Sequence, residues 1–468
     1  MKDNFTALTT EPVHRLINKL AGPTIISMLV TSFYVVADTY FVGKLNIQSV
    51  AAVGIVFAVM AVIQALGFFF GHGSGNYISR ELGAKRNRNA EVMAANGFFA
   101  GLFSGVGLML LGAVYLEDIS VFLGSTDTIL PYTKDYLSII LLGAPFMISS
   151  FVLSVQLRFQ GHARLAMAGV LTGAVLNIAL DPVLIFAAGM GLKGAAWATL
   201  ISQMVSFLIM MVLNRKYSVV PVNFRNIHFS LDSFKEIFNG GAPSLCRQVL
   251  VCIASVMLNV YAGRYAGDYG DAPIAAMSIV SRITMFINAF VIGFGQGFQP
   301  VCGYNYGAGL YTRVRSGFWY SVKVGVLFMI VCSSLGFLFS EQLVGIFAKQ
   351  DENVIAVGAI ALRWQLVAMP LGVWVILCNM FLQTIRRSTR AIILSSARQG
   401  IFFIPLMLLL PRWYGLFGVQ ICQAVADIFS FLLAVPMVWS VLASLKKDKP
   451  LSDGQSVDSG HMVSDETI

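Results

Sequence analysis

An amide, a carboxylate and a proline lie close together in an otherwise apolar stretch, VLNIALDPVLIF, at residues 175–186. Asn177 and Asp181 are four residues apart, so a helix places both side chains on one face. Pro182 follows directly, and a proline inside a helix frees the backbone carbonyl four residues earlier, here that of Ile178. An ionisable group at membrane depth is usually functional, and these oxygens suit a proton or a small cation. We predict an ion site with a helix break at Pro182; the alternative is that Asp181 caps the kink or pairs with a neighbour.

Two more polar stripes run along apolar segments of the first half of the chain. One stripe, at steps of four, three and four residues, consists of Ser27, Thr31, Tyr34 and Asp38. The other consists of Thr199, Ser202, Gln203 and Ser206. Each set falls on one helical face. If these helices share a bundle with residues 175–186, the stripes converge on a polar cavity that holds two carboxylates. The alternative for each hydroxyl alone is a bond to its own backbone.

The second half of the chain has different charges at membrane depth. Asp427 is accompanied there by Arg247, Arg282, Arg363 and Arg398. Because a lone buried charge is costly, we expect Asp427 to form an ion pair with an arginine such as Arg282 or Arg398. The sequence also lacks H-E-x-x-H, G-x-S-x-G and an ATP-binding domain. We therefore expect no enzyme and no cofactor, and active transport would draw on an ion gradient.

The composition is that of an integral membrane protein. Hydrophobic residues make up 57% of the 468 residues and charged residues only 12%, against about 25% charged in soluble domains. At about 20 apolar residues per crossing, the chain can hold about a dozen spans, and hydropathy divides it into that number. The expected segments lie near residues 16–42, 48–71, 92–116, 133–157, 165–188, 194–213, 236–262, 273–299, 316–340, 354–382, 391–410 and 415–443.

Charges alternate between the connections of these segments. The even-numbered connections and the C-terminal end are basic: Arg80, Lys85, Arg86 and Arg88; Arg158 and Arg164; Arg215, Lys216, Arg225 and Lys235; Arg313 and Arg315; Arg386, Arg387 and Arg390; Lys446, Lys447 and Lys449. The odd-numbered connections are acidic or nearly neutral. By the positive-inside rule both termini are cytoplasmic, in a multi-pass plasma (inner) membrane protein. This placement accounts for the net charge of +9 without a nucleic-acid partner.

The two halves of the chain repeat. AGPT at 21–24 matches GAPS at 241–244, and GLKG at 191–194 matches GLFG at 415–418. Three further matches, 51–55 with 275–279, 71–73 with 295–297 and 83–84 with 307–308, keep nearly the same offset. Each half has six expected spans, so both begin on the same side and the repeat is parallel, a transporter architecture.

We predict an all-α membrane protein of twelve transmembrane helices in two six-helix lobes around a central cavity. The expected parts are an N-terminal lobe at 1–213, a cytoplasmic linker at 214–235, a C-terminal lobe at 236–449 and a cytoplasmic tail at 450–468. The tail is polar, so we expect it to be disordered.

These residues resemble the multidrug and toxin extrusion (MATE) family over nearly the whole chain, from about residue 16 to 444. The most specific matches are YVVADTYFVG at 34–43 and LNIALDP at 176–182. The resemblance implies a secondary active exporter of small organic, often cationic, compounds. Such a protein exchanges its substrate for protons or sodium ions through a cavity between the lobes that opens to alternate sides. It also implies a lipid-embedded protein, which we expect to be monomeric.

The resemblance assigns roles to particular residues. Asp38 and Asp181 look like the paired first-lobe acids that bind the coupling ion, with Tyr34, Asn177 and Thr199 as companions. A sodium ion would be held by Asp38, Asp181 and Asn177. Some branches of the family also place a glutamate on the seventh segment, where this chain has Arg247 instead. That departure favours first-lobe coupling, as in the DNA-damage-inducible prokaryotic branch, and leaves the choice between H+ and Na+ open.

A second class of function stays open at this point. A lipid or lipid-linked precursor flippase of the same superfamily would also show repeats and polar cavities, and the second-lobe arginines are consistent with its basic cavity. A membrane-embedded enzyme is disfavoured because the acids lie near mid-span without a metal-binding histidine cluster.

Overall fold

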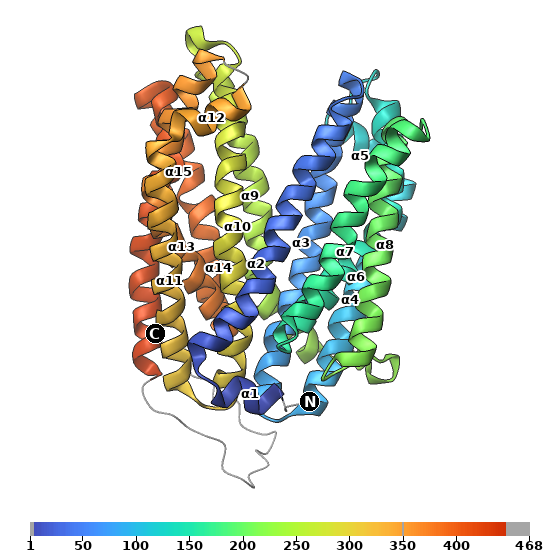
Figure 1. Cartoon of the computed structure of the whole chain (residues 1–468), viewed down its shortest axis with the longest axis vertical. Coiled ribbons are helices and arrows are strands. Elements are labelled where there is room, and N and C mark those ends of the chain that lie inside the picture. The colour runs from blue at the N-terminus through green and yellow to red at the C-terminus, as the bar shows by residue number, and fades with distance from the viewer. Residues whose placement is uncertain (1–3, 349–350, 446–468) are drawn as a thin grey trace.

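The computed structural model describes residues 4–348 and 351–445, and this part of the chain is almost entirely helical (Figure 1). The first half comprises α1 (Asn4–Thr10), α2 (Val13–Val42), α3 (Ile47–Gly83), α4 (Asn87–Val114), α5 (Leu116–Phe122), α6 (Leu130–Phe159), α7 (Ala163–Pro182), η1 (Val183–Ala187) and α8 (Gly191–Tyr217). The second half comprises η2 (Phe224–Asn226), α9 (Leu231–Arg264), η3 (Gly267–Tyr269), α10 (Ala272–Gly307), α11 (Tyr311–Leu338), α12 (Ser340–Ala348), α13 (Glu352–Thr384), α14 (Ser388–Ser396), η4 (Ala397–Ile401) and α15 (Phe403–Ser444).

The long helices make twelve crossings. Eleven helical stretches of the described chain are long and apolar enough to span a membrane, and the last, Ser388–Ser444, has 57 residues. Within it, Gly415 has φ 57° and ψ −136°, a conformation that is open to glycine but not to a helix. This stretch therefore turns back at Gly415 and crosses twice, which confirms the predicted count of spans.

The two halves repeat the same backbone turns in the same order. Residues with positive φ lie at the ends of corresponding helices in the two halves. The pairs are Lys85 and Gly309, Gly161 and Arg386, and Gly191 and Gly415. The offset in residue number between the members of a pair is almost the same in all three pairs. The halves form two helical bundles side by side, α2–α8 and α9–α15 (Figure 1). We call them the first and the second lobe.

The segment between the lobes is shorter than the expected linker at 214–235. α8 continues to Tyr217 and α9 begins at Leu231, because polar residues at a membrane surface can extend a helix that hydropathy cuts short. The side-chain carbonyl of Gln160 accepts hydrogen bonds from Ser218 Oγ at 2.6 Å and from the backbone N–H of Val219 at 2.8 Å. The linker is thereby held against the first lobe. The expected tail at 450–468 lies outside the described residues.

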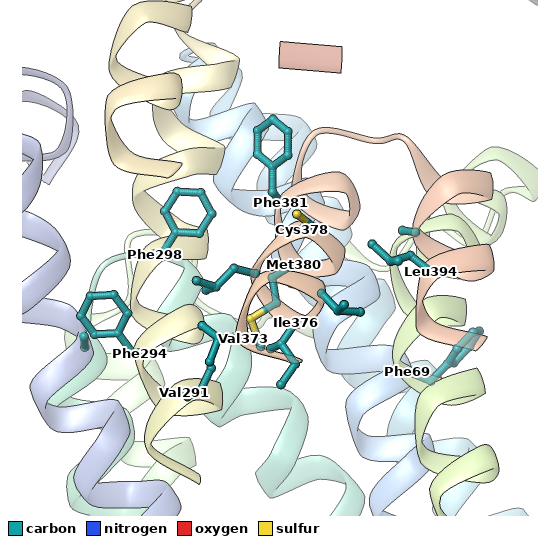
Figure 2. Close-up of a cluster of buried hydrophobic side chains, with 14 of the residues drawn as sticks. Phe69, Val291, Phe294, Phe298, Val373, Ile376, Cys378, Met380, Phe381 and Leu394 are labelled. Atoms are coloured by element: carbon teal, nitrogen blue, oxygen red, sulfur yellow. The ribbon is translucent and has the colours of Figure 1, made fainter. Parts of the chain in front are cut away.

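The interior of the second lobe is largely apolar. Figure 2 shows Phe294 and Phe298 of α10 beside Val373 and Met380 of α13. Burying such side chains excludes water and fixes the distance between the helices. Asp427 is the one fully buried charged residue among the described residues of this lobe.

The lobes touch through glycines near the face where both termini lie (Figure 1). A Cβ added at Gly241 of α9 would lie 2.2 Å from the carbonyl oxygen of Phe69 in α3. A Cβ at Gly297 of α10 would lie 2.5 Å from Cα of Ala21 in α2. The first helix of each lobe therefore begins against the other lobe, so the lobes are interlocked at this face. Toward the opposite face the two bundles diverge (Figure 1).

Ionic contacts reinforce this closed face. Arg80 of α3 lies 3.5 Å from Glu236 of α9 and donates to the carbonyl oxygen of Thr384 at 2.9 Å. Arg386 pairs with the same glutamate. α3 thus remains helical to Gly83, beyond the expected segment at 48–71, and its last turns form part of the contact between the lobes.

Candidate functional site

A cavity of about 130 Å³ lies within the first lobe, between α2, α3, α6, α7 and α8. The three predicted polar stripes meet here. The polar side chains of its wall are Thr31, Tyr34, Gln64, Ser150, Ser154, Asn177, Thr199, Ser202, Gln203 and Ser206. This first-lobe cavity is separate from the central one expected between the lobes, because its polar stripes face the interior of their own bundle.

Asp181 is the most unusual group beside this cavity. Its side chain is 0% exposed, and neither carboxylate oxygen has a hydrogen-bond partner among the described residues. Asp38 of α2 also has a buried, unpartnered oxygen, Oδ1. The charges of the two acids act on each other and on the hydroxyl of Tyr34. The structure therefore brings Asp38, Asp181 and Tyr34 together, as the sequence predicts.

The helix that carries Asp181 changes geometry directly after it. α7 ends at Pro182, and a π-helical turn, Val183–Ala187, follows. Proline cannot donate the next backbone hydrogen bond, and π turns are common at functional sites. Gly194 lets α8 pack directly against this turn, because a Cβ at Gly194 would lie 2.6 Å from the carbonyl of Leu184. The last glycine of the GLKG motif at 191–194 thus allows α8 to pack against the helix break.

Asn177 and Thr199 complete the predicted group. Asn177 Nδ2 lies 3.4 Å from Thr199 Oγ1, a long hydrogen bond. Within the described residues, Asn177 Oδ1 and Ser202 Oγ have no partner. Buried oxygens without partners are rare, because each loses its hydrogen bonds to water. Together with the acids they form a set of hard oxygen ligands that fits a proton or a sodium ion.

Sequence reasoning missed Tyr136 of α6. This tyrosine is fully buried, and its hydroxyl, close to Thr199, has no well-formed hydrogen bond. The charges of Asp38 and Asp181 act on it. Its spacing gave a signal, because residues 136, 140, 143 and 147 share one helical face, and Met147 lines the cavity. A tyrosine at the start of an apolar segment was simply less conspicuous than a carboxylate.

The second-lobe acid has a very different environment. Asp427 accepts bonds from Arg398 Nε at 2.7 Å and Nη2 at 3.1 Å, and from Gln423 Nε2 at 2.8 Å. Of the two candidate partners, Arg398 forms the pair, whereas Arg282 is exposed and takes no part in it. Periodicity could not choose between them, because the choice depends on how α10, η4 and α15 face one another.

Known proteins resemble this chain over most of its length. The MatE family model matches residues 23–183 and 243–409, once in each lobe. Multidrug export protein MepA of Staphylococcus aureus (strain NCTC 8325 / PS 47) is 28% identical over 439 residues, 93% of this chain and 96% of the relative. MepA of Staphylococcus saprophyticus is 29% identical over 429 residues, 91% of this chain and 94% of the relative.

Solved structures share the fold. A MATE protein in complex with MaL6 has a TM-score of 0.90 at 25% identity, covering 95% of this chain and 99% of that one. The outward-facing conformation of a multidrug resistance MATE transporter has a TM-score of 0.89 at 25% identity, with the same coverages. A Pyrococcus furiosus transporter of the MOP superfamily, described as having reverse polarity of its binding pocket, scores 0.88 at 25% identity and covers 96% and 99%. The chain therefore belongs to the MatE family and is a membrane transporter rather than an enzyme.

Proposed function

We propose that this protein exports small organic, often cationic, compounds across the plasma (inner) membrane in exchange for protons or sodium ions. The observation that carries the proposal is Asp181, fully buried with both oxygens unpartnered among the described residues, beside Asp38 in the first lobe. The names of the two MepA relatives support multidrug export. The resemblance of the motif pattern to the DNA-damage-inducible branch stays a prediction.

Coupling follows from competition for the same negative charge. An unpaired buried carboxylate is costly, so the site binds either a proton or a cation. When the coupling ion neutralises Asp38 and Asp181, the site loses its attraction for a cationic drug. When a drug cation leaves with the site facing outward, an ion enters and resets it. Exchange of the two needs no other energy source.

The break after Pro182 is suited to transmit ion binding. The π turn at 183–187 is followed by Gly189 and Gly191, both left-handed with φ of 65° and 57°. The backbone N–H groups of Ala188, Gly189 and Met190 donate to the carbonyls of Val183, Phe186 and Leu184 in a pattern that is not α-helical. Asp181 lies at the edge of this turn. Neutralising Asp181 changes the relative free energies of differently bent conformations of α7. Ion binding therefore shifts the populations of these conformations.

The contact between the lobes supports alternating access. The glycine contacts and the Arg80–Glu236–Arg386 cluster close the face that carries both termini. Charge alternation assigns that face to the cytoplasm, so this conformation opens outward. Transport then requires the lobes to separate at these contacts and approach at the other face.

The flippase hypothesis rested on a basic second-lobe cavity. Arg398 is paired with Asp427, Arg363 is paired with a glutamate at 3.0 Å, and Arg282 is exposed. Of these four arginines, Arg247 alone then contributes an unpaired charge inside the described part of the lobe. A single unpaired positive charge matches one carboxylate or phosphate group rather than the two linked phosphates of a lipid-linked precursor, so we favour drug export.

Transport by purified protein in liposomes tests the proposal. With a pH gradient or a sodium gradient imposed separately, wild type should extrude a fluorescent cation under one of them. Asp181→Asn and Asp38→Asn should each abolish this transport. Asp135→Asn serves as the control, since Asp135 is 49% exposed and pairs with Lys193 at the surface. Normal gradient-driven transport by both cavity variants would refute the proposal.

A further inference from the structure

The polar cluster of the second lobe occupies the counterpart of the first-lobe cavity. Gln423 and Asp427 stand in the second half where Thr199 and Gln203 stand in the first, at the offset that separates Gly415 from Gly191. Thr199 and Gln203 both line the cavity. The repeat therefore puts an amide and an acid of α15 where α8 presents a hydroxyl and an amide.

Two more positions agree with this equivalence. Arg398 and Gly372 correspond to Gly173 and Met147, at the offset between the left-handed residues that follow α13 and α6. Gly173 and Met147 both line the first-lobe cavity. A Cβ added at Gly372 would lie 3.4 Å from Arg398 Nη2 and from Asp427 Oδ2. A glycine in place of a methionine thus makes the room that the ion pair fills.

A second arginine lies on α9, the helix that packs against the η4 turn that carries Arg398. Arg247 of α9 is half-buried and forms no ion pair or hydrogen bond within the described residues. Its helix packs closely on η4, since a Cβ at Gly400 would lie 2.9 Å from Leu250 Cδ1. The charges of Arg247 and Arg398 act on each other. Two arginines and one aspartate leave one uncompensated positive charge in this cluster.

The pair is oriented with the arginine outermost. The Arg398 side chain is 16% exposed, whereas Asp427 is 0% exposed. Asp427 binds Nε and Nη2 and is itself held by Gln423. This bidentate contact fixes the plane of the guanidinium and leaves Nη1 free of the aspartate. A preorganised guanidinium on η4 and an unpaired one on the adjacent helix α9 are suited to bind an anionic oxygen group.

We propose that Arg247 and Arg398 form a second ligand site, which binds the carboxylate or phosphate group of an amphipathic organic compound. The first lobe would then take cationic groups and the second lobe anionic ones, so zwitterionic compounds become substrates. The inference deepens the proposed function and rests on it for the export of what is bound. The recognition itself depends only on the second lobe.

Two dyes that differ in one group test the site. Rhodamine 110 carries a free carboxylate, and rhodamine 123 is its methyl ester and is therefore only cationic. Binding to purified protein in nanodiscs is measured by fluorescence anisotropy. Arg247→Gln removes no partner of a buried acid, so the fold is retained. We expect this variant to raise the Kd for rhodamine 110 about tenfold or more. The Kd for rhodamine 123 should change by less than about twofold.

The control is Arg282→Gln, which removes an exposed arginine from the same lobe and should change neither affinity. Equal effects of Arg247→Gln on both dyes, or no effect on either, would overturn the site. Transport of rhodamine 123 that persists in Asp181→Asn would instead count against the proposed function.

Nanodiscs with increasing phosphatidylglycerol identify the source of the anion. If lipid phosphate occupies the site, it competes with rhodamine 110 in wild type but not in Arg247→Gln. If the site takes only the carboxylate of the soluble compound, binding is unaffected by the lipid. Either result supports the anion site, provided that Arg247→Gln weakens rhodamine 110 selectively.

Discussion

Two buried aspartates of this protein have opposite surroundings. Asp427 is neutralised by Arg398 and held by Gln423, whereas both oxygens of Asp181 lack partners among the described residues. A buried charge with a hydrogen-bonded partner is structural, while one without partners costs free energy that folding alone does not require. The same residue type is therefore ion-paired in the second lobe and unpaired in the first, where we propose that it binds the coupling ion.

This contrast predicts opposite effects on stability. Asp427→Asn leaves Arg398 without its counter-ion and should lower the free energy of unfolding by about 3–5 kcal/mol. Asp181→Asn removes an unpaired charge and should leave stability unchanged or raise it. Thermal unfolding of purified variants in one detergent measures both. Asp135→Asn at the surface should stay within about 0.5 kcal/mol of wild type. A large loss of stability in Asp181→Asn would mean that Asp181 has a structural partner.

Tyr136 offers a second test at the scale of single residues. Its hydroxyl has no well-formed hydrogen bond, so Tyr136→Phe should change stability by less than about 1 kcal/mol. If the hydroxyl is a ligand of the coupling ion, half-maximal transport should shift to a higher concentration of that ion. Transport titrated against proton or sodium concentration measures the shift. Tyr132→Phe, on the same helix, is the control, because the Tyr132 hydroxyl lies 3.5 Å from Asn46 Nδ2 and so has a partner of its own.

At the scale of helices, glycines determine how closely the lobes approach. Gly241 and Gly73 let α9 and α3 meet backbone to backbone, since a Cβ at Gly73 would lie 2.3 Å from the carbonyl of Ile237. Such contacts require small residues. The closed face is thus a feature of four helices rather than of one gate residue.

Adding one methyl group at this contact should disfavour the closed face. Gly241→Ala would place Cβ against the carbonyl of Phe69, whereas a Cβ at Gly22 meets nothing within 4 Å. We expect Gly241→Ala to increase amide hydrogen exchange in the last turns of α3 and the first turns of α9, because the lobes separate there more often. Gly22→Ala should leave exchange in both regions as in wild type. Unchanged exchange in Gly241→Ala would show that the contact tolerates a side chain.

At the scale of the whole molecule, two similar bundles carry different chemistry. The backbone turns of the two lobes match at a nearly constant offset, yet the acids of the cavity lie in the first lobe and the arginines in the second. The turns recur in both lobes because the fold depends on them. The cavity walls could diverge because a side chain there affects ligands more than packing.

Both termini lie at the closed face (Figure 1), so one labelling experiment tests the orientation. A tag at either terminus should be protected from a membrane-impermeant reagent in intact cells, because the basic connections lie on the same side. The tag should react after the membrane is permeabilised. Ser125→Cys, in an odd-numbered connection, is the positive control and should react from outside. Labelling of a terminus in intact cells would reverse the assigned direction of opening.

The sequence by itself determined the number of spans, the parallel repeat and the family. These follow from properties carried by short stretches, namely hydropathy, periodicity and turn-forming glycines such as Gly191 and Gly415. Asp38 and Asp181 stood out for the same reason, because a carboxylate in an apolar segment is visible without any neighbour. The ends of helices were less predictable, because hydropathy detects only the apolar part of a helix. α3 continues beyond its apolar part to Gly83.

Only the tertiary structure decided which side chains meet. It paired Asp427 with Arg398 instead of Arg282, added Tyr136 to the acids, and placed the described cavity inside the first lobe. These outcomes depend on the rotation and tilt of helices that are far apart in the chain. The packing of whole bundles sets those angles, and no periodicity within one segment encodes them.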